Sequence, residues 1–138
     1  MRYIGLDLGN RTCGLAISDP LGMIATSLYT VRFFEKDLDK ALEEVVKVIN
    51  EKKAEKIVMG YPLNMNGTLG QQSEYVLEFK KMLEKATNLE VILYDERLTT
   101  IEVQKVMISA DVSRNKRKKV VDTLAATLIL QSYLDSIR

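Results

Sequence analysis

The chain opens with the apolar stretch Tyr3-Ile4-Gly5-Leu6-Asp7-Leu8-Gly9, which has the character of a buried strand interrupted by one carboxylate. A carboxylate in a strand shielded from water loses several kcal/mol of hydration free energy, unless a metal ion, a cationic partner or local hydrogen bonds compensate for that loss. Asp7 is therefore the first candidate functional residue, and the rest of the sequence is interpreted outward from it.

Two further carboxylates stand next to apolar segments. Glu96 follows the apolar run Val91–Tyr94, and Asp122 opens a segment that is otherwise typical of an apolar helix. The chain contains no histidine, and oxygen ligands suit Mg²⁺ or Mn²⁺. The three carboxylates together predict a site for these hard cations.

Composition restricts the class of protein. The chain has 138 residues, 46% of them hydrophobic and 28% charged, which indicates one soluble globular domain over residues 1–138. No apolar run approaches the ~18 residues that span a membrane, and an N-terminus that enters a strand at once leaves no room for a signal peptide. One cysteine cannot form an internal disulfide, so a cytoplasmic location is expected.

The absence of histidine excludes several catalytic sites. A Ser-His-Asp triad, a Cys-His pair and a histidine-ligated zinc all require that side chain. Without an activating base, Cys13 is expected to be a small apolar strand residue.

Charge is distributed unevenly although the net charge is only +1. Residues 111–138 carry six basic and three acidic side chains, and five of the six residues 114–119 are basic. So dense a block attracts polyanions, although a merely solvated loop has the same composition.

Periodicity predicts a β-β-β-α-β-α-β-α-α order. We expect strands over 2–8, 12–18, 23–32, 56–60 and 90–95, helices over 36–52, 71–86, about 99–109 and 120–135, and a basic loop over 110–119. The first two strands are too close in sequence for a parallel crossover and should form an antiparallel hairpin. The order therefore favours an α/β ribonuclease H-like fold, a mixed five-stranded sheet with helices on both faces.

This arrangement is expected to bring the three carboxylates together. Asp7 shares a face of the central strand with Gly5, which should leave that face open, and Glu96 lies where parallel strands end. Asp122 is expected in the first turn of the last helix, followed on the same face by Ala125 and Ala126, which allow close approach to the sheet.

Each carboxylate also has a purely structural alternative. Asp7 could be a turn residue that hydrogen-bonds near Gly9, Glu96 could pair with Arg97, and Asp122 could favour the helix dipole. Weaker signals are the loop 61–70, which contains Asn66 and leads to a helix N-terminus suited to phosphate, and the pair Thr99 and Thr100, which could cap a helix or contact substrate.

At these residues the chain resembles the YqgF family of bacterial RNase H-like proteins, which are proposed as nucleases for the small-subunit ribosomal RNA precursor and also as Holliday junction resolvases. The matching motifs are Gly5-Leu-Asp7-Leu-Gly9 with Gly14-Leu-Ala-Ile-Ser-Asp19, Gly60-Tyr-Pro62-Leu-Asn-Met-Asn-Gly-Thr68, Asp95-Glu96-Arg97-Leu-Thr-Thr100, and Asp122-Thr-Leu-Ala-Ala126 with Ile129-Leu-Gln-Ser-Tyr133-Leu134. The resemblance implies that Asp7, Glu96 and Asp122 are the metal ligands. In the turn where many members carry one or two basic residues, this chain has only Arg11.

The resulting hypothesis is a nuclease that uses Mg²⁺ or Mn²⁺, two ions in all, to process the 5′ end of the 16S ribosomal RNA precursor. The expected partner is nucleic acid, with no membrane, and the expected state is a monomer or weak homodimer. The candidate substrate-binding residues are Arg11, Asn66, Arg97, Thr99, Thr100, Arg114, Lys116, Arg117, Lys118 and Lys119.

Three alternatives stay open at this point. One is a Holliday junction resolvase that acts on branched DNA. Another is a sugar kinase or actin-like ATPase, because Asp-x-Gly hairpins also bind ATP phosphates in a related fold, although those proteins need two such domains. The last is an RNA-binding ribosome-assembly factor without catalysis.

Overall fold

The structure, a computed structural model, describes residues 1–62, 70–97, 105 and 107–138, without the side chains of residue 71 and residues 118–123. Five strands form one sheet in the order β3-β2-β1-β4-β5. The elements are β1 (Tyr3–Leu8), β2 (Thr12–Ser18), β3 (Ala25–Arg32), α1 (Leu38–Lys52), β4 (Lys56–Tyr61), α2 (Gln71–Thr87), β5 (Val91–Asp95) and α4 (Arg114–Ser136).

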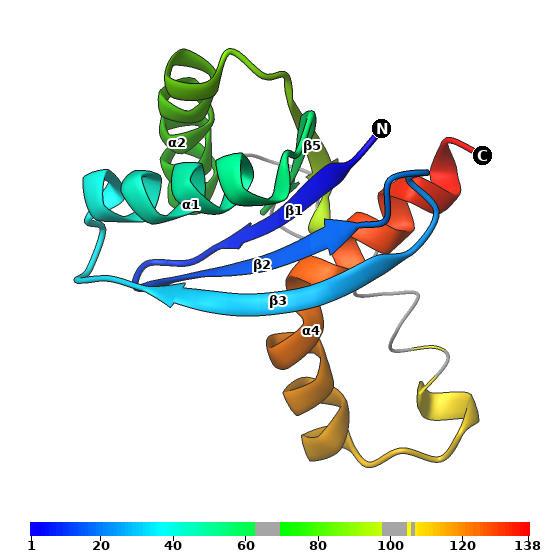
Figure 1. Ribbon diagram of the computed structural model, residues 1–138. Coiled ribbons are helices and arrows are strands. Elements are labelled where there is room, and N and C mark those ends of the chain that lie inside the picture. Colours follow the sequence, from blue (N-terminus) through cyan, green and yellow to red (C-terminus); the bar gives the residue numbers. More distant parts are fainter. Residues whose placement is uncertain (63–69, 98–104, 106) are drawn as a thin grey trace.

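The sheet has the predicted mixed topology. β1 is central, pairs antiparallel with β2 and parallel with β4, and β4 pairs parallel with β5. Figure 1 shows α1 and α2 on one face of the sheet and α4 on the other. The expected α/β architecture with helices on both faces is therefore confirmed.

The last helix differs most from the prediction. α4 begins at Arg114, where the Ser113 hydroxyl accepts a hydrogen bond from the Lys116 backbone N–H at 3.3 Å and so caps the helix. The expected basic loop over 110–119 is therefore wrong for residues 114–119, which are helical. Asp122 is the ninth residue of α4 rather than a first-turn residue.

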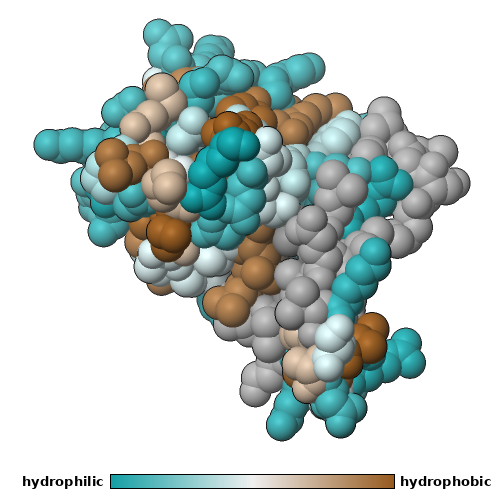
Figure 2. All heavy atoms as spheres, turned by 90° about the vertical axis from the view of Figure 1, so that its right-hand side faces the viewer, coloured by the Kyte–Doolittle hydropathy of each residue, from teal (hydrophilic) through white to brown (hydrophobic). Residues whose placement is uncertain are grey.

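The N-terminal half of α4 extends beyond the sheet. In Figure 1 it projects away from the body of the molecule, and in Figure 2 the lower end of the molecule carries hydrophilic side chains beside a few hydrophobic ones. The C-terminal half instead contributes the buried residues Ala126, Ile129, Leu130 and Leu134. Residues 114–119 contain no apolar side chain, and for this reason hydrophobic periodicity did not detect this first part of the helix.

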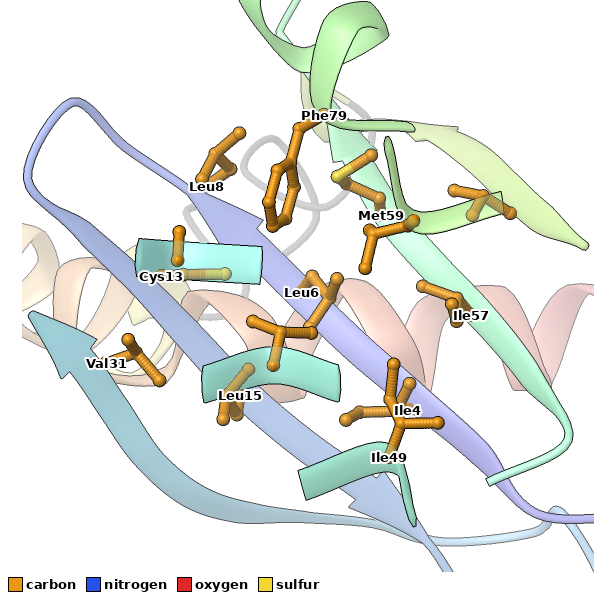
Figure 3. Close-up of a cluster of buried hydrophobic side chains, with 14 of the residues drawn as sticks. Ile4, Leu6, Leu8, Cys13, Leu15, Val31, Ile49, Ile57, Met59 and Phe79 are labelled. Atoms are coloured by element: carbon orange, nitrogen blue, oxygen red, sulfur yellow. The ribbon is translucent and has the colours of Figure 1, made fainter. Parts of the chain in front are cut away.

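The face covered by α1 and α2 is an apolar core. Alternate residues of β1, namely Ile4, Leu6 and Leu8, point into it, as does Phe79 of α2 (Figure 3). Cys13 is fully buried in the same cluster, which confirms the prediction for this residue. This face stabilises the fold and carries none of the three candidate carboxylates.

The face covered by α4 packs around Gly5. A Cβ atom at Gly5 would lie 2.7 Å from the Leu130 Cβ and 3.0 Å from the Ala126 carbonyl oxygen. The expectation that Gly5 leaves this face open is therefore wrong, because the backbone of α4 fills the space. Gly5 sets how closely α4 can approach the central strand.

Candidate active site

Asp7 lies near the end of the central strand and faces α4. It pairs with Gly14 across the β1–β2 hairpin, and a Cβ at Gly14 would lie 3.7 Å from the Asp7 Cβ and 3.5 Å from the Ala126 Cβ. The turn alternative for Asp7 is wrong, because the residue lies inside β1. The turn itself is closed by the Gly9 N–H donating to the Thr12 carbonyl at 2.7 Å.

Glu96 reaches across Gly60 toward the central strand. It directly follows Asp95, the last residue of β5, and a Cβ at Gly60 would lie 2.4 Å from the Glu96 Oε1 and 2.7 Å from its Cγ. Since Met59 pairs with Leu6, Gly60 stands level with Asp7. The absence of a side chain at Gly60 thus makes the space through which Glu96 approaches Asp7.

Asp7 and Glu96 form a strongly interacting carboxylate pair. The pKa of Glu96 is raised from its ordinary 4.5 to about 8, first by burial, then by the charge of Asp7, by a hydrogen bond to the Asp7 carboxylate and by the charge of Asp95. Two carboxylates in contact require a shared proton or a cation to offset their repulsion. The pair therefore has the donor chemistry that a hard divalent cation prefers.

The third predicted ligand is placed only through its backbone. Asp122 lies in α4 one helical turn before Ala126, which packs beside Gly14 and Asp7. Its side chain is outside the described part, and among the described side chains no group of three potential metal ligands occurs. The helix-dipole alternative for Asp122 is wrong, because that effect is confined to the first turn.

Arg97 pairs with Asp95. Its guanidinium donates to both Asp95 oxygens at 2.7–3.1 Å, and this holds the pKa of Asp95 below its ordinary range. The hydrogen bonds described for Arg97 thus go to Asp95, in contrast to the expected alternative of a pair with Glu96.

The other predicted binding residues that the structure describes lie in the β1–β2 turn and at the start of α4. Arg11 is exposed in the β1–β2 turn, 3.8 Å from Glu35, and Arg114 and Lys116 are exposed in the first turn of α4. Arg117 is half-buried, and its Nε is buried with no hydrogen-bond partner in the described structure. The side chains of Lys118 and Lys119, and the residues Asn66, Thr99 and Thr100, lie outside the described part, so their roles stay predictions.

A polar cleft beside Asp7 was missed from the sequence. It has a volume of about 60 Å³ and lies between β2, β3 and α4. Besides Asp7, its polar lining residues are Thr12, Ser27, Tyr29, Thr30 and Thr127. The available signal was the unusual density of hydroxyl side chains in Ala25–Arg32, which the prediction treated only as a strand.

Comparison with known proteins identifies the family. The family described as "RuvX: Holliday junction resolvase" matches residues 1–136. The chain belongs to this family. It is 52% identical, over 99% of its own length and 98% of the other's, to a protein of Clostridium botulinum strain Hall named "Putative pre-16S rRNA nuclease".

Solved structures show the same fold at low sequence identity. RuvC of T. thermophilus in complex with a Holliday junction substrate matches 99% of this chain and 96% of its own, with a TM-score of 0.60 and 14% identity. The ROK hexokinase of Thermus thermophilus matches 75% of this chain but only 38% of its own, with a TM-score of 0.51 and 22% identity. The RuvX-family chain thus has the RNase H-like fold of RuvC, and its family assigns it to the resolvase-like nucleases.

In the part of the chain that the structure describes, no helix combines the length and the apolar character needed to cross a bilayer.

Proposed function

We propose that this chain is a divalent-metal-dependent nuclease that hydrolyses phosphodiester bonds in the precursor of small-subunit ribosomal RNA. The observation that carries the proposal is the contact between Asp7 and Glu96 on the α4 face of the sheet. The family, and the name of the relative that is 52% identical over nearly the whole chain, support the nuclease and its RNA substrate.

The proposed ligands are Asp7, Glu96 and Asp122, and the proposed ions are two Mg²⁺ or Mn²⁺. When bound, such ions activate water and stabilise the leaving oxygen of an in-line displacement. The chain supplies the site that holds them. Gly60 makes room for the Glu96 side chain, and Arg97 offsets the charge of the neighbouring Asp95.

The basic residues of α4 support a polyanionic substrate. Cations near a helix N-terminus oppose the helix dipole, at a cost of about 0.3–1 kcal/mol each. α4 nevertheless has basic and no acidic residues in its first turn. Cations placed against the helix dipole, with no acidic residue beside them in that turn, are typical of a functional surface. Phosphate groups bound there would offset the unfavourable interaction between these cations and the dipole.

A specific observation also favours a second substrate, branched DNA. The family description names Holliday junction resolvases, and the fold matches a RuvC bound to such a junction. Symmetric cleavage of a junction requires a dimer, so a resolvase also predicts self-association. A kinase is less well supported, because the chain matches little more than a third of the hexokinase.

The test is purified protein with Mn²⁺ on a 16S precursor RNA and on a four-way DNA junction, side by side. We expect cleavage of the RNA, and its loss in Asp7→Asn and Glu96→Gln. Glu90→Gln is the matched control, since Glu90 is an exposed carboxylate before β5 that pairs with Lys56. Preferential junction cleavage would replace the RNA proposal, and ATP hydrolysis would favour the kinase. RNA binding without cleavage, unchanged in both carboxylate variants, would indicate an assembly factor.

A further inference from the structure

Strand β3 contains a β-bulge beside the candidate active site. Gly14 pairs with Thr30 and Ala16 with Ser27, so that Leu28 and Tyr29 together oppose the single residue Leu15. Bulges redirect side chains and are common next to active sites. Here Leu28 packs against the α1–α2 core, while Tyr29 lines the cleft that contains Asp7.

Tyr29 differs from the other tyrosines near this face. Tyr3, Tyr94 and Tyr133 pack against one another, with ring centroids 6.0 Å apart in both described pairs. Tyr29 is 51% exposed although it lines a cleft. An aromatic ring that is half open to solvent, next to a catalytic carboxylate, has a free surface on which a flat ligand can stack.

The size and lining of the cleft restrict that ligand. A volume of about 60 Å³ holds a few water-sized groups, such as the hydroxyls of a sugar. The hydroxyls of Thr12, Ser27, Thr30 and Thr127 can each donate and accept hydrogen bonds, and among the described residues no basic side chain lines the cleft. The arrangement fits a ligand with a small polar part inside and an aromatic part outside.

We propose that the cleft receives the ribose hydroxyls of an unpaired nucleotide next to the scissile bond, while its base stacks on Tyr29. This inference rests on the proposed nuclease function and deepens it. Stacking on a tyrosine ring requires a base with a free face, which single strands offer and continuous duplexes do not. The site therefore selects an unpaired segment at the point of cleavage, whereas the basic residues 114–119 of α4 contact phosphates whether or not the bases are paired.

Binding without cleavage tests the proposal independently of catalysis. Affinity for a single-stranded RNA and for the same sequence as a duplex is measured in EDTA with wild type, Tyr29→Phe and Tyr29→Leu. We expect Tyr29→Phe to keep wild-type affinity and Tyr29→Leu to bind the single strand about 5- to 100-fold more weakly, with a much smaller change on the duplex. Equal single-strand affinity of Tyr29→Leu and wild type would overturn the proposal.

A fluorescent reporter gives a second, direct readout, because the chain contains no tryptophan. Tyr29→Trp places a single indole at the cleft, and Leu21→Trp is the matched control, since Leu21 is exposed in the β2–β3 turn and does not line the cleft. We expect single-stranded RNA to quench the emission of Tyr29→Trp and not that of Leu21→Trp. Equal responses of the two proteins would also overturn the proposal.

Two further arms separate this inference from its premise. Single-stranded DNA in the same titration shows whether the unpaired nucleotide is RNA or DNA. Addition of Mn²⁺ to the wild-type mixture tests cleavage. Stacking on Tyr29 without cleavage would contradict the nuclease function but support the nucleotide site. Cleavage with no effect of the Tyr29 variants would support the nuclease function but contradict the nucleotide site.

Discussion

The two faces of the sheet have different roles: one holds the apolar core and the other the candidate active site. On the α1–α2 face, Ile4, Leu6 and Leu8 are buried among other apolar side chains. On the α4 face, alternate residues of the same strand are Gly5, which admits a helix, and Asp7, which contacts Glu96. One six-residue strand thus serves stability on one side and the candidate chemistry on the other, and the two-residue period of a strand makes that separation possible.

Unfavourable interactions are concentrated on the α4 face of the sheet. The α1–α2 face contains the larger apolar cluster, and the burial of these side chains stabilises the fold. The α4 face has a smaller cluster and accepts a raised carboxylate pKa, a polar cleft and basic residues at a helix N-terminus. A stable first face is what allows the second to hold two carboxyl groups in contact.

The largest expected effect comes from removing packing on the core face. Leu6→Ala should lower the free energy of unfolding by about 2–5 kcal/mol, because it leaves a cavity where side chains cannot collapse. Above about pH 8, where both carboxylates are charged, Asp7→Asn, one residue along on the other face, should leave the metal-free protein as stable as wild type or more so, since it removes a repulsion. Urea unfolding in EDTA measures both, and a large loss in Asp7→Asn would mean that Asp7 is structural.

An intermediate effect is expected from pH. The folded pKa of Glu96, about 8, lies above its ordinary 4.5, so folding favours the protonated form. This contribution is full below about pH 4.5 and is lost as pH rises toward 8, so the metal-free protein should become less stable over that range, by roughly 1.4 kcal/mol per unit at most. Glu96→Gln should flatten the slope. Parallel stability–pH curves for the two proteins would contradict the described environment of Glu96.

The smallest expected effect on stability comes from the basic segment of α4. Lys116→Glu should stabilise the helix start by about 0.3–1 kcal/mol, because it replaces an unfavourable interaction with the dipole by a favourable one. The same change should weaken nucleic-acid binding, and neutral Lys116→Ala should reduce the salt dependence by about one phosphate contact. Unchanged binding in both variants would leave the segment as a solvated helix end, and Arg11 would become the leading phosphate contact.

Much of the fold follows from the sequence because its patterns are local. The alternation in β1, the short connection to β2 and the apolar stripe of α1 predict the element order, and the alternation of strands and helices predicts the parallel pairs. The start of α4 was not predicted, since residues 114–119 lack an apolar face and charge density favours a loop. The available signal was Ser113, a residue type that caps helix N-termini. This signal is weak compared with the five cations that follow it, which favour a loop.

The sequence predicted which carboxylates belong to the candidate site, but not the neighbouring residues that shape it. Carboxylates in apolar segments stand out in any sequence, which is why Asp7 and Glu96 were identified. The role of Gly60, by contrast, depends on the register of β4 with its neighbours, and Tyr29 reaches the cleft only through a bulge. Such features depend on tertiary pairing, which no local pattern encodes.

The central claim is that the Asp7–Glu96 pair binds a divalent cation, and calorimetric titration with Mn²⁺ tests it most directly. Wild type should bind, Asp7→Asn should bind at least about 10-fold more weakly, and Glu90→Gln should match wild type. Gly60→Ala removes no carboxylate but places a Cβ 2.4 Å from the present position of the Glu96 Oε1, so it should also weaken binding. Equal Mn²⁺ affinity in wild type and Asp7→Asn would contradict the account.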